Sequence, residues 1–553
     1  MQVRDAARSL DPTQRISDSL VVAAVVVLSL IVYVGRLGFN SDDWAFLARL
    51  TAASDQDSII ALCQALFANE GLRLRPVQIV YLATLYAFFG VNPTGYHLVN
   101  AAVLVASAVT FYLVARELWL PRALALAIAV VYALLPNYSA DRFWPAAAQA
   151  PLSVWLYLVS LLIDLRLVSG RTPHLWPWKS VSLVALLMSG LAYELILPFI
   201  PLNLLLMWWH AQRVHGVEKG RCFVRAHAAL VFGTNVAVLC ALVAFKLATT
   251  RRVRMNEGYI AHIVYLVNGT VRANYFTFGA GIPYLTVWGL RGDLSPGLVL
   301  AGVAIVVLVG VYVYRSLAEP DWAKLTSTFW LKLILSGVFV SFWGYAIFIN
   351  NDNVVFTTSN VDTRTAIVAT AGVAMVLIGC LGWISHRLSE RVGKLTFSVS
   401  VAALCLYGFL VINRLATFWV AAYQEELNIL YDIRDHLPTL RKDTTLILDG
   451  TCLDIGPVFV FRFNWDLSGA LAIMYRDPSL KATVVTPETK LESSEVLIRT
   501  FRVFDDYPYG PDLLLYNGRQ KVVYALTDFD RARTYFDTLA SKATCPPPFS
   551  WRV

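Results

Sequence analysis

The sequence predicts a polytopic α-helical membrane protein of about eleven transmembrane helices, followed by a C-terminal α/β domain. Of its 553 residues, 57% are hydrophobic and only 15% are charged, whereas soluble globular proteins carry about 25% charged residues. Apolar runs recur along the chain up to about residue 412. The net charge of +8 comes from basic residues in alternate loops, as the positive-inside rule requires, so we expect no nucleic-acid partner.

The first predicted span, residues 20–34, follows a basic tail, which places the N-terminus in the cytoplasm. The alternation of basic loops then predicts ten further spans at 96–114, 123–135, 149–163, 181–192, 195–209, 227–245, 296–314, 331–349, 364–383 and 395–412. Residues 76–89 are apolar but too few to cross a bilayer, so we interpret them as an interfacial helix. If this segment crossed, every later basic loop would lie outside.

After residue 412 the composition changes. Strand-like runs at 444–448, 483–485 and 522–524 alternate with helix-like stretches at 467–475, behind Asp466 as a candidate N-cap, and at 531–539. The sequence therefore predicts a transmembrane domain at 1–412 and an α/β domain at 413–553. An odd number of spans places the second domain on the periplasmic side, where disulfides persist.

A disulfide between Cys452 and Cys545 is predicted in this domain, which would close a loop of about 93 residues. The alternative pairings use Cys63, which lies in the apolar first-loop stretch 59–67. There a buried free thiol is favoured.

The first outer loop opens with two adjacent carboxylates, Asp42 and Asp43. Such a pair directly after a span is costly unless it is solvated or used. The structural alternative is a helix N-cap at Ser41 or Asp42 with acids in the first turn. That alternative explains one carboxylate well and two less well, so we predict a catalytic role for the pair.

Arginines are unexpectedly frequent in the predicted outer loops. They are Arg49, Arg73, Arg75, Arg142, Arg251, Arg252, Arg254, Arg272 and, at the start of an inbound span, Arg364. Because a guanidinium binds phosphate through two hydrogen bonds, we predict contacts of Arg75, Arg364, Arg142 and Arg272 with a phosphate-bearing lipid. The alternative is that these side chains anchor to lipid headgroups by snorkelling.

Glu194 has apolar neighbours on both sides and lies near the outer boundary of a short span. An ionisable residue at this depth indicates a functional site, and we predict that it belongs to the donor-binding group. It could equally be the structural partner of an arginine, and a carboxylate that orients a phosphate-binding arginine does both.

Four short patterns now follow in order along the chain. They are Asp42-Asp43, Arg75-Pro76 leading to Phe89-Gly90, Arg116-Glu117-Leu118, and Tyr193-Glu194. This order resembles the GT-C superfamily of integral-membrane glycosyltransferases, and in layout the protein O-mannosyltransferases and lipid A aminoarabinose transferases. The resemblance covers residues 15–412.

The resemblance implies a GT-C-like architecture and a polyprenyl-phosphate-linked sugar donor. It also implies inverting hexosyl or pentosyl transfer to a glycan, lipid or protein acceptor on the outer face of a bacterial inner membrane. The role of catalytic base falls on Asp42, which must reach the acceptor hydroxyl. Cations stabilise the leaving phosphate.

The sequence departs from the family at two positions. The lysine that often precedes the intramembrane glutamate is Tyr193 here, and the second-loop stretch 145–151 lacks the acid that helps relatives to bind a metal, since Asp141 lies earlier. We therefore predict no metal ligand and leave open whether the reaction needs a divalent metal.

The alternative function is a transporter or flippase of lipid-linked sugars, but such proteins usually show related halves and paired broken helices, which we do not find in the sequence.

Overall fold

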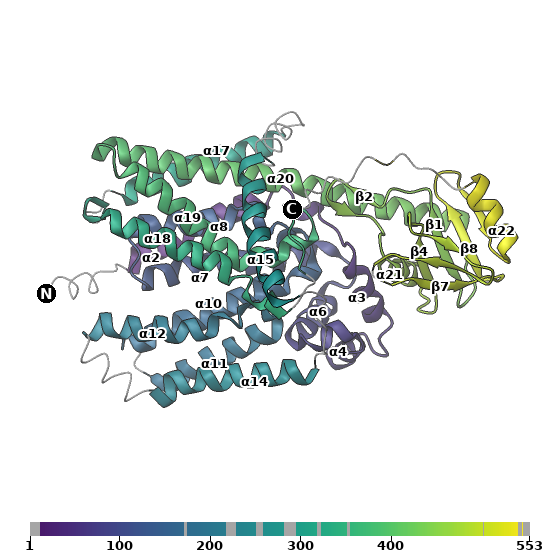
Figure 1. The fold of residues 1–553 in the computed structure, drawn as a ribbon, viewed down its shortest axis with the longest axis horizontal. Coiled ribbons are helices and arrows are strands. Elements are labelled where there is room, and N and C mark those ends of the chain that lie inside the picture. Colours follow the sequence, from purple (N-terminus) through teal and green to yellow (C-terminus); the bar gives the residue numbers. More distant parts are fainter. Residues whose placement is uncertain are drawn as a thin grey trace.

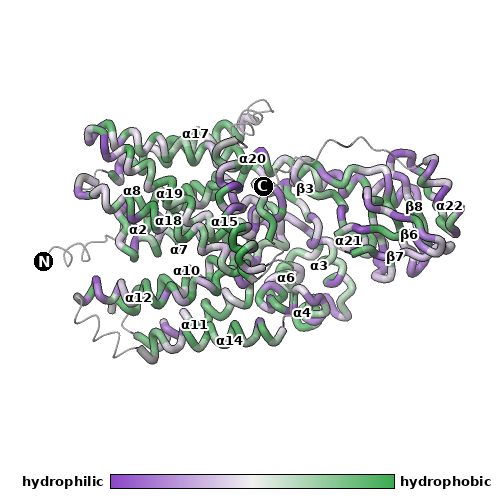
Figure 2. The backbone as a smooth tube through the Cα atoms, in the orientation of Figure 1, coloured by the Kyte–Doolittle hydropathy of each residue, from purple (hydrophilic) through white to green (hydrophobic). Residues whose placement is uncertain are grey.

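The structure, a computed structural model, describes residues 12–170, 174–216, 228–249, 258–280, 295–317, 322–350, 354–501, 503–539 and 545. A bundle of roughly aligned helices carries a strand-containing domain at one end, which we call the domain end (Figure 1). Hydrophobic segments fill the bundle, whereas the C-terminal domain is more hydrophilic (Figure 2). This division confirms a multi-pass helical membrane protein with a C-terminal α/β domain.

Eight helical segments within the described residues are long and apolar enough to cross a membrane. They contain α2 (Pro12–Leu30) with η1 (Val34–Arg36), α7 (Pro93–Glu117), η3 (Pro145–Ala147) with α10 (Gln149–Val168), α11 (Leu175–Ala192), η5 (Ala228–Gly233) with α14 (Thr234–Thr249), α17 (Pro296–Ser316), η9 (Val361–Ala366) with α19 (Ile367–Ser385), and α20 (Glu390–His436). Three other predicted spans coincide with shorter helices, α8 (Arg122–Leu134), α12 (Phe199–His215) and α18 (Ser327–Trp343). The count of eleven spans stays a prediction.

Buried polar clusters hold the bundle together. Lys179 on α11 donates to Asp164 on α10 at 2.8 Å and to Asn235 on α14 at 2.9 Å. Each of these three side chains is almost fully buried. Because the charges are paired and hydrogen-bonded, this cluster is a structural contact between three helices. The span predicted at 181–192 begins earlier than expected, because α11 starts at Leu175 and so includes Lys179.

Close helix packing explains two glycines in the apolar segments. A side chain at Gly372 on α19 would clash with the carbonyl of Gly337 on α18. Small residues at such crossings let helix backbones approach within a membrane.

The segments between the spans at the domain end form short helices. They are α3 (Asp42–Thr51), α4 (Ile59–Phe67), α5 (Glu70–Arg73), α6 (Pro76–Phe89), η2 (Pro136–Tyr138), α9 (Ala140–Phe143), η4 (Glu194–Ile196), α15 (Tyr259–Tyr275), η6 (Phe276–Ala280) and η8 (Ala346–Asn350). A further short helix, η7 (Trp322–Lys324), lies between α17 and α18. Figure 1 places α6 beside α3 and α4. The loop expected between residues 246 and 295 contains α15, which runs across the direction of the bundle helices (Figure 1).

The long helix α20 joins the bundle to the C-terminal domain. It has 47 residues and a length of about 70 Å at 1.5 Å per residue, well beyond the bilayer core of about 30 Å. The predicted domain boundary at 412/413 falls inside this helix. The first strand begins at Thr445.

The C-terminal domain contains three sheets. The strands are β1 (Thr445–Asp449), β2 (Asp454–Ile455), β3 (Val458–Phe459), β4 (Lys481–Val484), β5 (Lys490–Leu491), β6 (Glu495–Ile498), β7 (Asp505–Pro508), β8 (Leu513–Asn517) and β9 (Val522–Ala525). The main sheet has the order β4-β1-β8-β9 and is parallel except for β9, which pairs antiparallel with β8. The second sheet, β5-β6-β7, is antiparallel, and β2 pairs with β3.

Helix α21 (Asn464–Tyr475) connects β1 to the parallel strand β4, as a crossover between parallel strands must. The prediction of Asp466 as its N-cap is wrong by three residues. Phe463 is the N-cap residue, and the Asp466 carboxylate in the first turn accepts the Phe463 backbone N–H at 3.1 Å. The chain ends its described part with α22 (Phe529–Thr534), η10 (Tyr535–Leu539) and Cys545.

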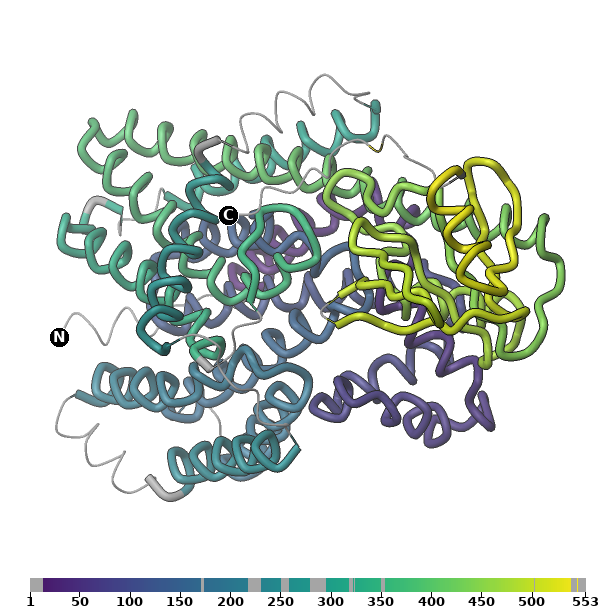
Figure 3. The backbone as a smooth tube through the Cα atoms, turned by 45° about the vertical axis from the view of Figure 1, so that its right-hand side comes forward, coloured from purple at the N-terminus to yellow at the C-terminus, as the bar shows by residue number. Residues whose placement is uncertain are grey.

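The C-terminal domain packs directly on the first-loop helix α3, and Figure 3 shows the two chain segments side by side. Helices α21 and α3 meet at Gly469, where a Cβ would lie 2.5 Å from the Trp44 carbonyl oxygen. The buried Glu426 carboxylate on α20 accepts from Asn40 at 3.2 Å and from the Trp44 indole at 2.8 Å. The first loop, α20 and the C-terminal domain are therefore one packed unit.

The predicted Cys452–Cys545 disulfide is confirmed, with Cα atoms 5.5 Å apart, and Cys63 is a free thiol on α4. The bridge spans 93 residues. A loop of this size corresponds to up to about 4–5 kcal/mol of stabilisation.

We expect the double variant Cys452→Ser/Cys545→Ser to unfold its C-terminal domain at a lower temperature, measured by differential scanning calorimetry. The control Cys240→Ser changes a free, exposed thiol, and an equal loss there would contradict the prediction.

Candidate functional site

The two adjacent carboxylates of the first loop point to different places. Asp43 is buried, and its two oxygens accept the backbone N–H groups of Asn40 at 2.9 Å and of Ala146 at 2.8 Å. It therefore fixes the start of α3 and joins the first loop to η3. Asp42 is partly exposed and lines a pocket. Ser41 is the N-cap residue but its side chain makes no capping hydrogen bond, and both acids lie in the first turn of α3. The structural alternative thus accounts for Asp43, whereas the catalytic role of Asp42 stays a prediction.

The backbone beside Asp42 is unusual. Ser41 precedes α3 with φ +50°, a conformation that is uncommon outside glycine. Such outliers persist where the surrounding structure imposes them and often occur at functional sites.

The pocket that Asp42 lines has a volume of about 360 Å³ at the domain end of the bundle. Arg75 precedes α6, and Arg364 lies in η9 before α19; both line the same pocket. Gln78 and Gln149 add amide groups to its wall, and Gln78 donates to Gln149 at 3.2 Å. Three segments more than 30 residues apart in the chain thus place one carboxylate and two guanidinium groups together.

Arg364 is a cation of this pocket whose donors are free within the described residues. Its guanidinium lies 4.9 Å from the centre of the Trp144 ring. Within the described residues its side chain makes no hydrogen bond, and no carboxylate lies within 4.0 Å of it. A guanidinium whose flat face is held by an aromatic ring keeps its N–H edge available for an oxyanion.

Arg75 is held in place by an ionic cluster. Its guanidinium donates to both oxygens of Glu194, at 2.8 and 3.3 Å, and lies 4.4 Å from the centre of the Tyr193 ring. Lys246, on the last turn of α14, donates to Glu194 at 3.2 Å. Glu194 thus has the arginine partner that the sequence offered as an alternative, and this arginine lines the pocket.

Glu194→Gln tests this cluster through the pH dependence of stability. Burial alone would raise the pKa of Glu194, but Arg75 and Lys246 lower it to about 2, below the value of about 4.3 in an unfolded chain. Such a carboxyl stabilises the fold above about pH 4.3 and loses this contribution as the pH falls toward 2. We expect Glu194→Gln to destabilise the protein at pH 7 by up to about 3 kcal/mol, with a difference in melting temperature that shrinks below pH 4.

The control for this variant is Glu488→Gln in the C-terminal domain. Glu488 pairs with Arg499 at 3.0 Å, and both side chains are exposed. An exposed pair contributes about 0–1 kcal/mol, so this substitution should change the melting temperature little at any pH. A Glu194→Gln effect that is equally large at pH 7 and pH 3 would contradict the role of the ionised carboxylate.

The other predicted phosphate-binding arginines lie outside the pocket. Arg142 is buried on α9, where it donates to the Tyr138 hydroxyl at 3.5 Å. Arg272 lies on the exposed face of α15. Arg251, Arg252 and Arg254 are outside the described residues. Arg49 is exposed and contributes to the pocket wall.

Asp141, next to Arg142, is fully buried, and neither carboxyl oxygen has a hydrogen-bond partner among the described residues. Burial raises the pKa of Asp141 well above the usual carboxyl range, against the opposing effects of Arg364 and Arg142. Within the described residues, no group of three or more His, Cys, Asp or Glu side chains is placed to hold a metal ion.

The C-terminal domain completes the pocket with a residue that the sequence did not suggest. The Trp465 indole on α21 lines the pocket and donates to Asp42 Oδ1 at 2.9 Å. Lys246 was also missed, although a lysine at the end of an apolar helix is a readable signal. Trp465 gives no such signal, because it meets Asp42 across 423 residues of chain.

The environment of Asp42 favours proton uptake. Burial raises the pKa of Asp42 above the usual carboxyl value, while the Arg364 charge and the hydrogen bond from Trp465 oppose the shift. A carboxylate with a raised pKa is a stronger base, and cations beside it can hold an anion that forms during a reaction.

No protein-family model matches this sequence, and no curated protein matches it significantly. Among solved structures, the chain is similar to ArnT from Cupriavidus metallidurans, whose crystal structure was determined bound to undecaprenyl phosphate. The two share 15% identity over 85% of this chain and 86% of that chain, with a TM-score of 0.36. Because both values are low, function is inferred from the site itself.

Proposed function

We propose that this protein is a GT-C-type glycosyltransferase that moves a hexosyl or pentosyl group from a polyprenyl-phosphate-linked donor to an acceptor hydroxyl. The observation that carries the proposal is that Asp42, Arg75 and Arg364 line one pocket. A carboxylate can act as the base that takes the proton of an acceptor hydroxyl, and guanidinium groups can stabilise the departing phosphate. The order of the sequence motifs supports the same chemistry.

In the proposed reaction, Asp42 accepts the proton of the acceptor hydroxyl. The acceptor oxygen attacks the anomeric carbon on the face opposite the phosphate, and the bond between that carbon and the phosphate oxygen breaks. Transfer therefore inverts the anomeric centre, and polyprenyl phosphate leaves as an anion. The raised pKa of Asp42, which is due to burial, favours proton transfer to it.

In the proposed site, the two arginines bind the phosphate in different ways. Arg364 supplies free N–H donors, and Arg75 supplies charge from a position fixed by Glu194 and Lys246. We assign Asp43 a positioning role, since both of its oxygens are used by backbone N–H groups. Arg142 and Arg272 are not assigned to the donor, because neither lines the pocket.

In the proposed topology the N-terminus is cytoplasmic and the C-terminal domain is periplasmic, in a bacterial inner membrane. The pocket lies at the domain end, so transfer takes place on the outer face. This position suits a lipid-linked donor and a glycan, lipid or protein acceptor that lies outside the cell membrane.

The test combines a lipid assay with glycan analysis. We expect the purified protein in nanodiscs to release polyprenyl phosphate from its lipid-linked sugar in the presence of cell-envelope extract. Mass spectrometry of surface glycans from a deletion strain should show the loss of one sugar. If the protein instead moves the intact lipid-linked sugar between leaflets without cleaving it, the protein is a transporter and the proposal is wrong.

A further inference from the structure

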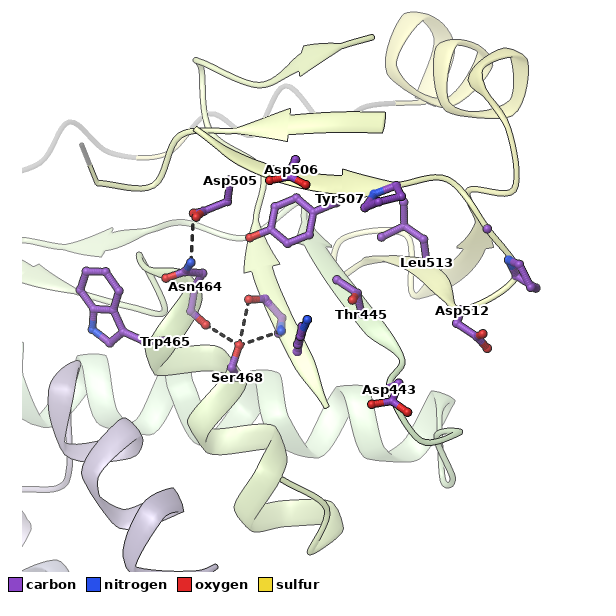
Figure 4. A pocket seen from close by; sticks show the side chains of 15 residues that line it. Asp443, Thr445, Asn464, Trp465, Ser468, Asp505, Asp506, Tyr507, Asp512 and Leu513 are labelled. Atoms are coloured by element: carbon purple, nitrogen blue, oxygen red, sulfur yellow. Dashed lines mark hydrogen bonds between the residues drawn. The ribbon is translucent and has the colours of Figure 1, made fainter. Parts of the chain in front are cut away.

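A second cavity lies in the C-terminal domain, next to the candidate active site. It has a volume of about 510 Å³ and is lined by α21, by the strands β1, β4 and β7, and by the turn before β8. Figure 4 shows Trp465 and Asn464 at one end of this cavity and Asp512 and Asp443 at the other. We call it the domain cavity. Trp465 lines both the domain cavity and the pocket of Asp42.

The ring of Trp465 is held rigidly between the two cavities. It stacks on Phe463 with ring centres 4.5 Å apart and an angle of 4° between the planes, and Phe501 meets it edge-on at 5.8 Å. The indole N–H is fixed by Asp42 at 2.9 Å. A partly exposed aromatic ring with a fixed orientation offers a flat apolar face beside polar groups.

The two cavities have opposite charge. The domain cavity is lined by four aspartates and one lysine, whereas the pocket of Asp42 is lined by three arginines and one aspartate. A phosphate group is therefore attracted to the pocket of Asp42 and repelled from the domain cavity. These charges favour, in the domain cavity, a ligand that is uncharged or carries an amine.

The polar groups of the domain cavity suit a ligand with many hydroxyls. Carboxylates accept hydrogen bonds from hydroxyl donors, and Asp506 and Asp512 are exposed at the cavity wall. Asn464 donates to Asp505 at 3.0 Å, which orients both groups at the end beside Trp465. Carboxylates, an amide and an aromatic face together are complementary to the hydroxyl and C–H faces of a sugar.

We propose that the domain cavity binds the acceptor, that the acceptor is a neutral or amine-bearing saccharide without phosphate, and that Trp465 leads its reacting hydroxyl to Asp42. This inference rests on the proposed function and names the acceptor of the same site. A saccharide that occupies the domain cavity and passes Trp465 meets the carboxylate that takes its proton.

The first test is binding of purified full-length protein in detergent to a glycan array that carries neutral, amine-bearing and phosphorylated oligosaccharides. We expect binding to neutral or amine-bearing glycans and none to phosphorylated ones. The double variant Asp506→Asn/Asp512→Asn should bind at least about tenfold more weakly, because each lost charge-assisted hydrogen bond weakens binding. The matched control Asp530→Asn changes an exposed aspartate on α22 and should bind as wild type.

The second test separates the two roles of Trp465, the hydrogen bond of its indole N–H and the contact of its aromatic ring. Trp465→Phe keeps an aromatic ring but loses the N–H that reaches Asp42, so glycan binding should persist while turnover falls. Trp465→Ala removes the ring, so glycan binding should also fall, with a higher KM for the acceptor. Glycan binding that is unchanged in Trp465→Ala and in the aspartate variant would overturn the inference.

Binding to phosphorylated glycans alone, or to no glycan class, would also overturn it. Undecaprenyl phosphate binding, measured on the same preparations, keeps the two proposals apart. Loss of lipid binding with intact glycan binding contradicts the donor of the proposed function and leaves the saccharide site supported. Intact lipid binding without glycan binding contradicts only the saccharide site.

Discussion

Asp42→Asn is expected to reduce turnover about 10²–10⁴-fold, the usual contribution of a general base. The amide cannot take a proton from the acceptor hydroxyl. It keeps the Oδ1 oxygen that accepts the Trp465 indole N–H at 2.9 Å, so the contact between α3 and α21 persists. The measurement is the single-turnover rate of sugar transfer from a polyprenyl-phosphate-linked donor, together with undecaprenyl phosphate affinity, which should change little.

Asp43→Asn is the matched control, because it makes the same chemical change one residue away. Asp43 accepts two buried backbone N–H groups, and an amide can accept only one of them well. We expect a loss of about 1–3 kcal/mol of stability and a much smaller loss of turnover per folded molecule. Near-normal turnover in Asp42→Asn, or an equal loss in both variants, would rule out Asp42 as the base.

The pH profile gives a second check of the same assignment. Burial raises the pKa of Asp42, so the acidic limb of the turnover profile should lie above the ordinary carboxyl value of about 3.9. Below that limb the base is protonated and transfer stops. Asp42→Asn should remove this limb from its residual activity.

The sequence predicted the helical part of the fold well because its signals are local. A run of about 20 apolar residues indicates a membrane helix from local sequence alone, and helices occur at all eleven predicted positions. Strand β1 and the disulfide were also predictable, the first from a β-branched run and the second from the few cysteines outside the membrane. The length of α20 was not, since its outer half, residues 413–436, mixes apolar with charged residues and has the pattern of neither a membrane span nor a linker.

The site was predictable only in part, for a physical reason. Asp42 and Asp43 are neighbours in sequence, and their different roles follow from which backbone N–H groups fold against Asp43. Likewise Arg75, Arg364, Arg142 and Arg272 are all arginines in or beside predicted outer loops. Only the packing of the chain places the first two in the pocket. Trp465 depends on a contact between two domains, which no local pattern encodes.

Arg364→Ala is expected to weaken undecaprenyl phosphate binding about 10–100-fold, the value of one or more hydrogen bonds to a charged group. Arg364→Lys should lie between this variant and wild type, because lysine keeps the charge but loses the flat, forked donor that packs on Trp144 and meets two phosphate oxygens. Within the described residues Arg364 has no ion-pair partner to lose, so both variants should keep near-normal thermal stability. Affinity is measured by scintillation proximity with labelled lipid in nanodiscs.

Arg272→Ala and Arg272→Lys are the controls for this series. Arg272 lies on the exposed face of α15, outside the pocket, so these variants should bind the lipid as wild type does. Snorkelling arginines contact many headgroups weakly, and their loss would lower membrane affinity without phosphate selectivity. If Arg364→Ala binds undecaprenyl phosphate as tightly as Arg272→Ala, Arg364 is a lipid anchor. The leaving phosphate would then depend on Arg49 at the pocket wall and on Arg75, whose Nε and Nη2 already donate to Glu194.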